Sequence, residues 1–227
     1  MSPLPAKAIM TAPVITVPPE MPVRDAVRIL IDRHISGLPV IDAAGRLVGI
    51  VTEADLLYKE ATPKPAEPLL RWFGRSLWLE RLTGPYRKAE GRTVADVMTH
   101  NVITAGEETP VHALASRMVR FGVNRLPIVR EDGTVAGIVT RADVLKVFLR
   151  GDELLEREAR TILDEFLIFG EEVGVSASRG VYALRGVVGS PGRRQGLLTR
   201  LWGVDGVVAI DDHDLKEAFQ ESAAMWE

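Results

Sequence analysis

The stretch GIVTEAD at residues 49–55 returns as GIVTRAD at residues 137–143, so the two copies differ at one position. A shift of 88 residues aligns them, and it also aligns their flanks without a gap from Ile9 to Leu57. The identical aligned positions include Met10 and Met98, Thr11 and Thr99, Leu38 and Leu126, and Pro39 and Pro127. Sequence similarity over this length predicts an internal structural repeat.

Each copy carries a helix signal followed by two strand signals. Apolar residues recur with the i, i+3, i+4, i+7 spacing of a half-buried helix after Pro22 and again after Pro110. Pairs of β-rich runs joined by short turns then predict a hairpin in each copy. These runs are residues 38–41 with 47–51, and residues 126–129 with 135–139.

Short VIT runs at 14–16 and 102–104 predict an extra strand before each helix, and a last helix is expected to open at Thr52 or Thr140. A unit of about 50 residues buries too little apolar surface to be stable alone, so we expect the copies to pack with pseudo-two-fold symmetry. The predicted fold class is α/β (α+β), with two strand-helix-strand-strand-helix repeats. The expected domains are repeat 1 at 1–60, an insert at 61–92, repeat 2 at 93–150 and a C-terminal module at 151–227.

Composition limits the classes of function. The 28 Lys and Arg residues stand against 31 Asp and Glu residues, so the net charge of -3 gives no general attraction for nucleic acid, and none is expected as a partner. The absence of cysteine excludes disulfides and thiolate chemistry and is compatible with a reducing cytoplasm. With no secretory signal pattern and no long apolar run, we expect a soluble, cytoplasmic protein.

The IMT and VMT openings, the LPV and LPI strands and the G-I-V-T-x-A-D endings together resemble a tandem pair of cystathionine-β-synthase-type (CBS) domains over roughly residues 5–150. This resemblance implies a Bateman module, whose two clefts bind adenosine-containing ligands in many members, such as AMP, ADP, ATP or S-adenosylmethionine. It also implies a homodimer. No cofactor is expected to be required.

The Thr-x-x-Asp pairs, Thr52 with Asp55 and Thr140 with Asp143, have the spacing of a helix capping box, which explains them by helix stability alone. The same geometry suits a nucleotide, because a helix N-terminus attracts phosphate and a carboxylate accepts ribose hydroxyls. In the resembled family this Asp holds ribose and the Thr lies by the phosphate. The resemblance implies adenine contacts near Val14, Ile15, Val102 and Ile103, and it adds Thr16, Thr104, Pro39 and Pro127 to the candidate lining.

The two clefts are expected to be unequal. The second copy carries Asn124 and Arg125 before its LPI strand and Arg141 within its motif, where the first copy has Ser36, Gly37 and Glu53. We therefore expect phosphate to prefer the second cleft, with Arg125 and Arg141 as charge-assisted donors. The alternative places both arginines on solvated faces. The first cleft is expected to be empty, structural, or suited to an uncharged adenosine group.

The insert combines Trp72 and Trp78 with interspersed arginines. One interpretation is a basic amphipathic helix on a membrane or a partner. The other is that the aromatic residues cover the core of the pair or a dimer seam.

The C-terminal module shows the order helix, strand, strand, helix, strand. Its glycine-spaced strand at 180–187 and the V-x-G-V at 204–207 resemble the BON domain family, which is associated with phospholipid binding. Arg193, Arg194 and Arg200 are accordingly candidates for contact with anionic lipid or a protein partner, or else they lie on a solvated face.

The four histidines show no metal-ligand spacing, and no nucleophile with a base and an oxyanion donor is recognisable, so we assign no metal site and no catalytic residue. We predict a non-catalytic regulatory protein that binds an adenosyl ligand in the cleft of the pair and signals through the BON-like module. The alternatives are a peripheral phospholipid-binding adaptor and a structural dimerisation module with vacant clefts.

Overall fold

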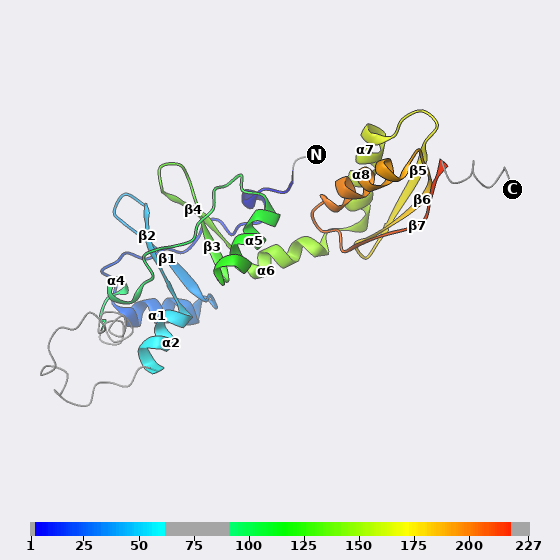
Figure 1. Cartoon of the computed structure of the whole chain (residues 1–227). Helices are drawn as coiled ribbons and strands as arrows, with labels where there is room; N and C mark the ends of the chain where they lie inside the picture. The colour runs from blue at the N-terminus through cyan, green and yellow to red at the C-terminus, as the bar shows by residue number, and fades with distance from the viewer. Residues whose placement is uncertain (1–2, 62–90, 219–227) are drawn as a thin grey trace, which may run out of the picture. The chain divides into compact units, whose positions relative to one another are not determined.

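The computed structural model describes residues 3–61 and 91–218 (Figure 1). The chain divides into two compact units. We call them the hairpin unit, which comprises Met10–Glu108 and Arg120–Val139, and the C-terminal unit, which comprises Met1–Ile9, Thr109–Val119 and Thr140–Glu227. The fold is mixed α and β, as expected from the sequence.

The repeat produces a hairpin and two flanking helices in each copy. The first copy has α1 (Val23–Asp32), β1 (Gly37–Ile41), β2 (Leu47–Thr52) and α2 (Glu53–Ala61). The second has α5 (Val111–Phe121), β3 (Arg125–Val129), β4 (Val135–Thr140) and α6 (Arg141–Lys146). Each hairpin forms a two-stranded sheet. The predicted hairpins, the helices after Pro22 and Pro110, and the helices that open after Thr52 and Thr140 are therefore confirmed.

The extra strand predicted at 14–16 and 102–104 is wrong. Only the next residue of each run pairs, because Val17 bridges Val40 and Ala105 bridges Ile128 in parallel orientation. The runs cannot extend further into a ladder, since two prolines follow Val17 and a turn begins soon after Ala105.

The opening segment of each copy, residues 5–16 and 93–104, contributes a short helix, η1 (Ala6–Ala8) or α4 (Val94–Val97). Within the hairpin unit these segments pair with the opposite copy. Thr99 and Ile50 exchange backbone hydrogen bonds of 2.9 and 3.0 Å, and Thr11 and Ile138 exchange bonds of 2.9 and 3.1 Å. Both pairs obey the 88-residue offset, so the contacts are related by the pseudo-two-fold symmetry of the repeat.

One hydrophobic core of the hairpin unit contains residues of both copies. Its buried members are Val17, Ala26, Leu30, Leu38, Val40, Val51, Val94, Val97 and Met98. Val94, Val97 and Met98 come from the opening segment of the second copy, yet they fill the core beneath β1 and β2. The first copy therefore does not complete its own core, as its small size predicted.

The C-terminal module follows α6 through η3 (Val147–Leu149). Its elements are α7 (Asp152–Phe166), β5 (Glu172–Ser178), β6 (Val181–Val188), α8 (Pro191–Trp202) and β7 (Ala209–Glu217), in the order predicted. β6 lies in the centre of the sheet, antiparallel to β5 and parallel to β7. The helices α7 and α8 cover one face of this sheet (Figure 1).

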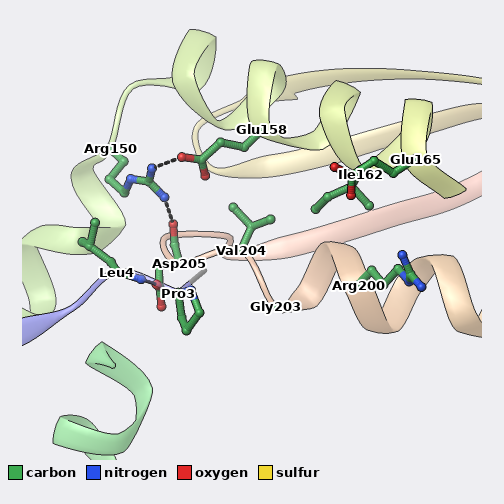
Figure 2. Close-up of a pocket in the computed structure, with 10 residues that line it drawn as sticks. All are labelled: Pro3, Leu4, Arg150, Glu158, Ile162, Glu165, Arg200, Gly203, Val204 and Asp205. Atoms are coloured by element: carbon green, nitrogen blue, oxygen red, sulfur yellow. Dashed lines mark hydrogen bonds and ion pairs between the residues drawn. The ribbon is translucent and has the colours of Figure 1, made fainter. Parts of the chain in front are cut away.

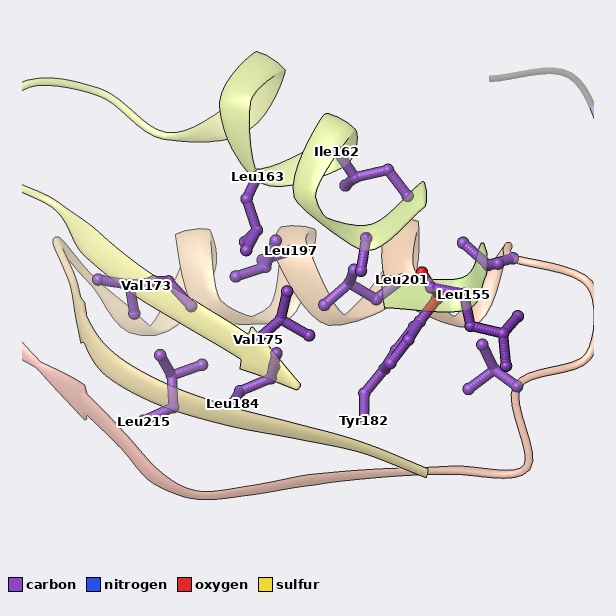
Figure 3. Packing of buried hydrophobic residues seen from close by; sticks show 14 residues of the cluster. Leu155, Ile162, Leu163, Val173, Val175, Tyr182, Leu184, Leu197, Leu201 and Leu215 are labelled. Atoms are coloured by element: carbon purple, nitrogen blue, oxygen red, sulfur yellow. Dashed lines mark hydrogen bonds between the residues drawn. The ribbon is translucent and has the colours of Figure 1, made fainter. Parts of the chain in front are cut away.

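Alternating residues of the strands meet the two helices in a single core (Figure 3). Tyr182 is fully buried, and its hydroxyl donates to the carbonyl of Leu155 at 2.7 Å. Burial, together with the nearby Glu158, raises the pKa of Tyr182 to about 12. Among the described residues, no helix is both long and apolar enough to cross a membrane.

Candidate functional site

The first Thr-x-x-Asp motif joins β2 to α2. The Asp55 carboxylate accepts from the backbone N–H of Thr52 at 3.0 Å and from its hydroxyl at 2.8 Å, through the same oxygen Oδ2. The other oxygen, Oδ1, accepts from the hydroxyl of Thr99 at 3.1 Å. Asp55 is buried, with 7% of its surface exposed. A carboxylate from one copy is thus bonded to the opening segment of the other.

The same hydrogen-bond pattern occurs at two further places. Thr140 donates to Asp143 from its N–H at 2.9 Å and its hydroxyl at 2.6 Å. Thr93 donates to the exposed Asp96 at 2.8 and 2.9 Å. The capping box alone therefore explains the geometry of these three Thr-x-x-Asp pairs, and a binding function requires a further feature around the motif.

Asp143 differs from Asp55 in the partner of its second oxygen. Lys146 donates to Asp143 Oδ1 at 3.0 Å. Burial raises the pKa of Asp143, but the hydrogen bonds from Thr140 and the Lys146 ammonium outweigh it, so the pKa lies below its usual value. The second motif consequently carries its own counter-charge.

The further feature at the first motif is a pocket of about 430 Å³, which lies within the hairpin unit. This size falls in the range of small-molecule sites. The wall combines the β2–α2 junction of the first copy with the opening segment and the start of β3 from the second. The lining residues are Ile50, Thr52, Glu53, Ala54, Asp55, Leu57, Thr99, Asn101, Val102, Ile103, Gly122, Val123, Asn124 and Arg125.

This composition corrects the grouping expected from the sequence. Asn124 and Arg125 were assigned to a cleft with Thr140 and Asp143, but they line the pocket of Thr52 and Asp55. The physical reason is that two parts of the second copy contact the first: Thr99 of the opening segment pairs with Ile50, and Arg125 at the start of β3 bonds to Ser36. Val102 and Ile103 also line this pocket. They are one of the two residue pairs that were expected from the sequence as adenine contacts.

Arg125 crosses to the first copy. Its guanidinium donates to the carbonyl oxygen of Ser36 and, at 2.8 Å, to the Ser36 hydroxyl. Burial lowers its pKa, while the charges of Glu53 and Asp55 act in the opposite direction. Gly37 lies directly beneath this guanidinium, and a β-carbon at Gly37 would lie 3.0 Å from Arg125 Cδ. The alternative that placed Arg125 on a solvated face is therefore wrong.

The other sequence candidates lie outside this pocket. Pro39 and Pro127 are buried in β1 and β3, and Thr104 is half-buried beside the pocket wall. Val14 and Thr16 are half-buried, Ile15 is exposed, and Arg141 is exposed at the start of α6. Sequence reasoning missed Thr99 and Asn101. Thr99 had a signal, since the Met-Thr dipeptide is identical in both copies.

The three basic candidates of α8 are engaged within their own unit. Arg193 donates to Glu171 at 2.6 Å, to the carbonyl of Phe166 at 2.7 Å, and lies over the Phe166 ring. Its hydrogen bonds lower the pKa of Glu171 to about 2. Arg194 bonds to Asp212 at 2.8 Å, and Arg200 packs on the Phe166 ring. These contacts do not favour lipid headgroups at Arg193 or Arg194. Trp72 and Trp78 lie outside the described residues.

A second pocket, of about 220 Å³, lies in the C-terminal unit (Figure 2). Arg150, which follows η3, donates to the carbonyl of Asp205 and to Glu158 at 2.5 Å. The backbone N–H of Leu4 donates to the Asp205 carboxylate at 2.6 Å. The loop after α8 is thereby tied to both the exit of α6 and the first described residues.

Comparison with known proteins places the pocket in a family context. Residues 6–61 and 94–150 match the family model of the CBS domain. The uncharacterised protein MJ1426 of Methanocaldococcus jannaschii is 31% identical over 55% of this chain and 80% of its own length. The chloroplastic CBSX2 of Arabidopsis thaliana is 31% identical over 59% of this chain and 58% of its own. The L-aspartate semialdehyde sulfurtransferase of M. jannaschii is 31% identical, but only 23% of its length is matched.

Two solved structures share this fold and carry adenosine-containing ligands. CBSX2 in complex with AMP has a TM-score of 0.56 and 28% identity, covering 64% of this chain and 97% of that chain. The CBS domain pair of MJ0100, in complex with 5′-methylthioadenosine and S-adenosyl-L-methionine, has a TM-score of 0.51 and 30% identity, covering 64% and 96%.

Proposed function

Because this chain belongs to the CBS-domain family, we propose that its tandem pair binds an adenosine-containing ligand and that the protein is a regulatory module rather than an enzyme. The observation that carries the proposal is the pocket around Asp55, a buried carboxylate bonded to residues of both copies. Complexes of two related CBS pairs with AMP and with adenosyl thio-compounds support this class of ligand.

The pocket walls suit the two halves of a nucleoside. The ribose hydroxyls bond to the Asp55 carboxylate at Oδ1, the oxygen that accepts from the hydroxyl of Thr99. The adenine ring packs between apolar side chains of both copies, including Val102, Ile103 and Leu57. A ligand in this position ties the two copies together, so it stabilises whichever arrangement of the copies holds it best.

The second motif offers a route for the signal to the C-terminal module. Asp143 is bonded to Lys146 in α6, and that helix continues through η3 to Arg150, which holds Asp205 and Glu158. Gly206 packs against the carbonyl of Val147, where a β-carbon would lie 2.6 Å away. We propose that a ligand at Asp143 acts on the C-terminal module through this short, closely packed connection.

A homodimer forms part of the proposal. Exposed apolar side chains recur at equivalent positions of the repeat, Ile31 with Val119 and Leu57 with Leu145, and each is more than 60% exposed. A set of apolar positions that repeats with the internal symmetry suits a second copy of the chain.

The assignment of residues 151–227 to the BON family, signalling to a protein partner, and a cytoplasmic location stay predictions. The lipid-adaptor alternative is weaker than the sensor, because Arg193 and Arg194 are held by carboxylates of their own unit.

Thermal unfolding of the purified chain with adenosine, AMP, ATP and S-adenosylmethionine, and a GTP control, tests the function. A ligand at 100 times its Kd adds about 2.7 kcal/mol, or roughly 5–11 °C in Tm for this size. Asp55→Ala is expected to abolish the shift at the first pocket. Asp96→Ala is the matched control, since Asp96 forms the same capping box outside the pocket. The proposal fails if no adenosyl ligand shifts Tm, or if both variants respond like the wild type.

A further inference from the structure

Among the described residues that line the Asp55 pocket, the ionisable side chains are Glu53, Asp55 and Arg125, and together they carry a formal charge of -1. Asp55 is assigned to ribose under the proposed function. The choice between ligands then depends on the group attached to the 5′ carbon of the ribose, which meets the remaining pair, Glu53 and Arg125.

Arg125 is already hydrogen-bonded within the protein. Its guanidinium bonds twice to Ser36, once to the backbone carbonyl and once to the hydroxyl. A phosphate can bind Arg125 only by breaking these bonds in a half-buried position, which leaves the Ser36 carbonyl with one partner fewer. The guanidinium of Arg125 therefore serves to hold the two copies together, and it is not free to bind a phosphate without losing these bonds.

The N-terminus of α2 is also a poor binding site for phosphate. A helix N-terminus binds anions through its free N–H groups. Here the N–H of Glu53 donates to the Ser36 carbonyl at 3.2 Å, and the N–H of Asp55 donates to the Thr52 hydroxyl at 3.4 Å. The first side chain of the helix is the exposed carboxylate of Glu53, which repels a phosphate at this end of the pocket.

We infer that this pocket selects adenosyl ligands whose 5′ group is neutral or cationic, such as a thioether or a sulfonium, over 5′-phosphates, and that Glu53 determines the selection. This inference rests on the proposed adenosyl function. The repeat supplies an internal contrast, because the position equivalent to Glu53 in the second copy is Arg141.

The test is titration calorimetry of the full chain at pH 7.5 with 5′-methylthioadenosine, S-adenosylmethionine and AMP. Binding that disappears in Asp55→Asn is assigned to this pocket. We expect 5′-methylthioadenosine and S-adenosylmethionine to bind there at least about tenfold more tightly than AMP. Glu53→Arg, which places the residue of the second copy in the first, is expected to shift the ratio toward AMP by about tenfold or more.

Glu131→Arg is the matched control, since it makes the same change of charge at an exposed turn between β3 and β4. It is expected to leave the ratio unchanged. The inference is overturned if AMP binds the Asp55-dependent site as tightly as the thioether, or if Glu53→Arg and Glu131→Arg have equal effects; the proposed function survives either result. Absence of any Asp55-dependent adenosyl binding overturns both.

Discussion

Met98 packs directly on the backbone of Gly49, where a β-carbon would lie 3.0 Å from the methionine Cγ. Met10 occupies the equivalent place over Gly137. The glycine of each G-I-V-T motif thus leaves room for the opening methionine of the opposite copy. The spacing between Met-Thr and G-I-V-T is the same in both copies, so the two copies make equivalent contacts with each other.

Gly137→Ala is expected to destabilise the hairpin unit by about 1–3 kcal/mol through overpacking. A β-carbon there would lie 2.7 Å from Met10 Sδ and 2.9 Å from the backbone carbonyl oxygen of Thr11, and the latter cannot rotate away. Urea unfolding measures the loss. Gly192→Ala, at an open helical position of α8, is the control and should be neutral or slightly stabilising. Equal stability of the two variants would contradict the packing argument.

The Glu171–Arg193 pair predicts the acid stability of the C-terminal unit. The folded-state pKa of Glu171 is about 2, below its ordinary value of 4.5, so the unfolded chain binds more protons between these values. The stabilisation is complete above pH 4.5 and is lost as the pH falls toward 2. Glu171→Gln is expected to cost about 1.5–3 kcal/mol at pH 7.

Unfolding monitored by circular dichroism from pH 7 to 2.5 measures this dependence. The difference between wild type and Glu171→Gln should shrink steadily below pH 4.5. A difference that stays constant over the whole range would mean that the carboxylate charge does not stabilise the fold. Glu153→Gln, at an exposed position of α7, is the control.

Arg150→Ala is expected to loosen the loop between α8 and β7. The side chains of Arg150 and Glu158 are only 14% and 17% exposed, so truncation leaves a partly buried carboxylate without its partner. We expect a loss of about 3 kcal/mol and faster hydrogen exchange of residues 203–208. Arg157→Ala, an exposed arginine of the same region, should leave the exchange of this loop unchanged. If residues 203–208 of Arg150→Ala exchanged as slowly as in the wild type, the proposed connection through Arg150 would be contradicted.

Leu145→Lys tests the homodimer. Leu145 is 63% exposed, so the charge is tolerated in a monomer but costs free energy in an apolar interface. We expect the wild type to sediment as a dimer at micromolar concentration and the variant to sediment as a folded monomer, with a Tm lower only by the lost association. Val208→Lys, 52% exposed in the C-terminal unit, is expected to remain dimeric. A monomeric wild type would refute this part of the proposal.

Several residues named as candidates from the sequence line the same pocket, but their grouping was predicted wrongly. Thr52, Asp55, Val102, Ile103, Asn124 and Arg125 were all candidates, and all of them line one pocket. The error was to assign Asn124 and Arg125 to the motif of their own copy. The capping interpretation of Thr-x-x-Asp is confirmed at both motifs, while its role in ligand binding stays a prediction.

The sequence by itself determined the repeat, the hairpins, the helix starts and the αββαβ order of the C-terminal module. Periodicity, prolines and turn residues act between neighbours in the chain, so they can be recognised locally. Only the tertiary structure decided which copy each opening segment covers. Met10 and Met98 each had two nearly identical glycine-containing strands to pack on, and two equivalent partners have nearly equal local free energies. The choice depends on how the whole pair closes its shared core, and that closure also brought Arg125 to Asp55 rather than to Asp143.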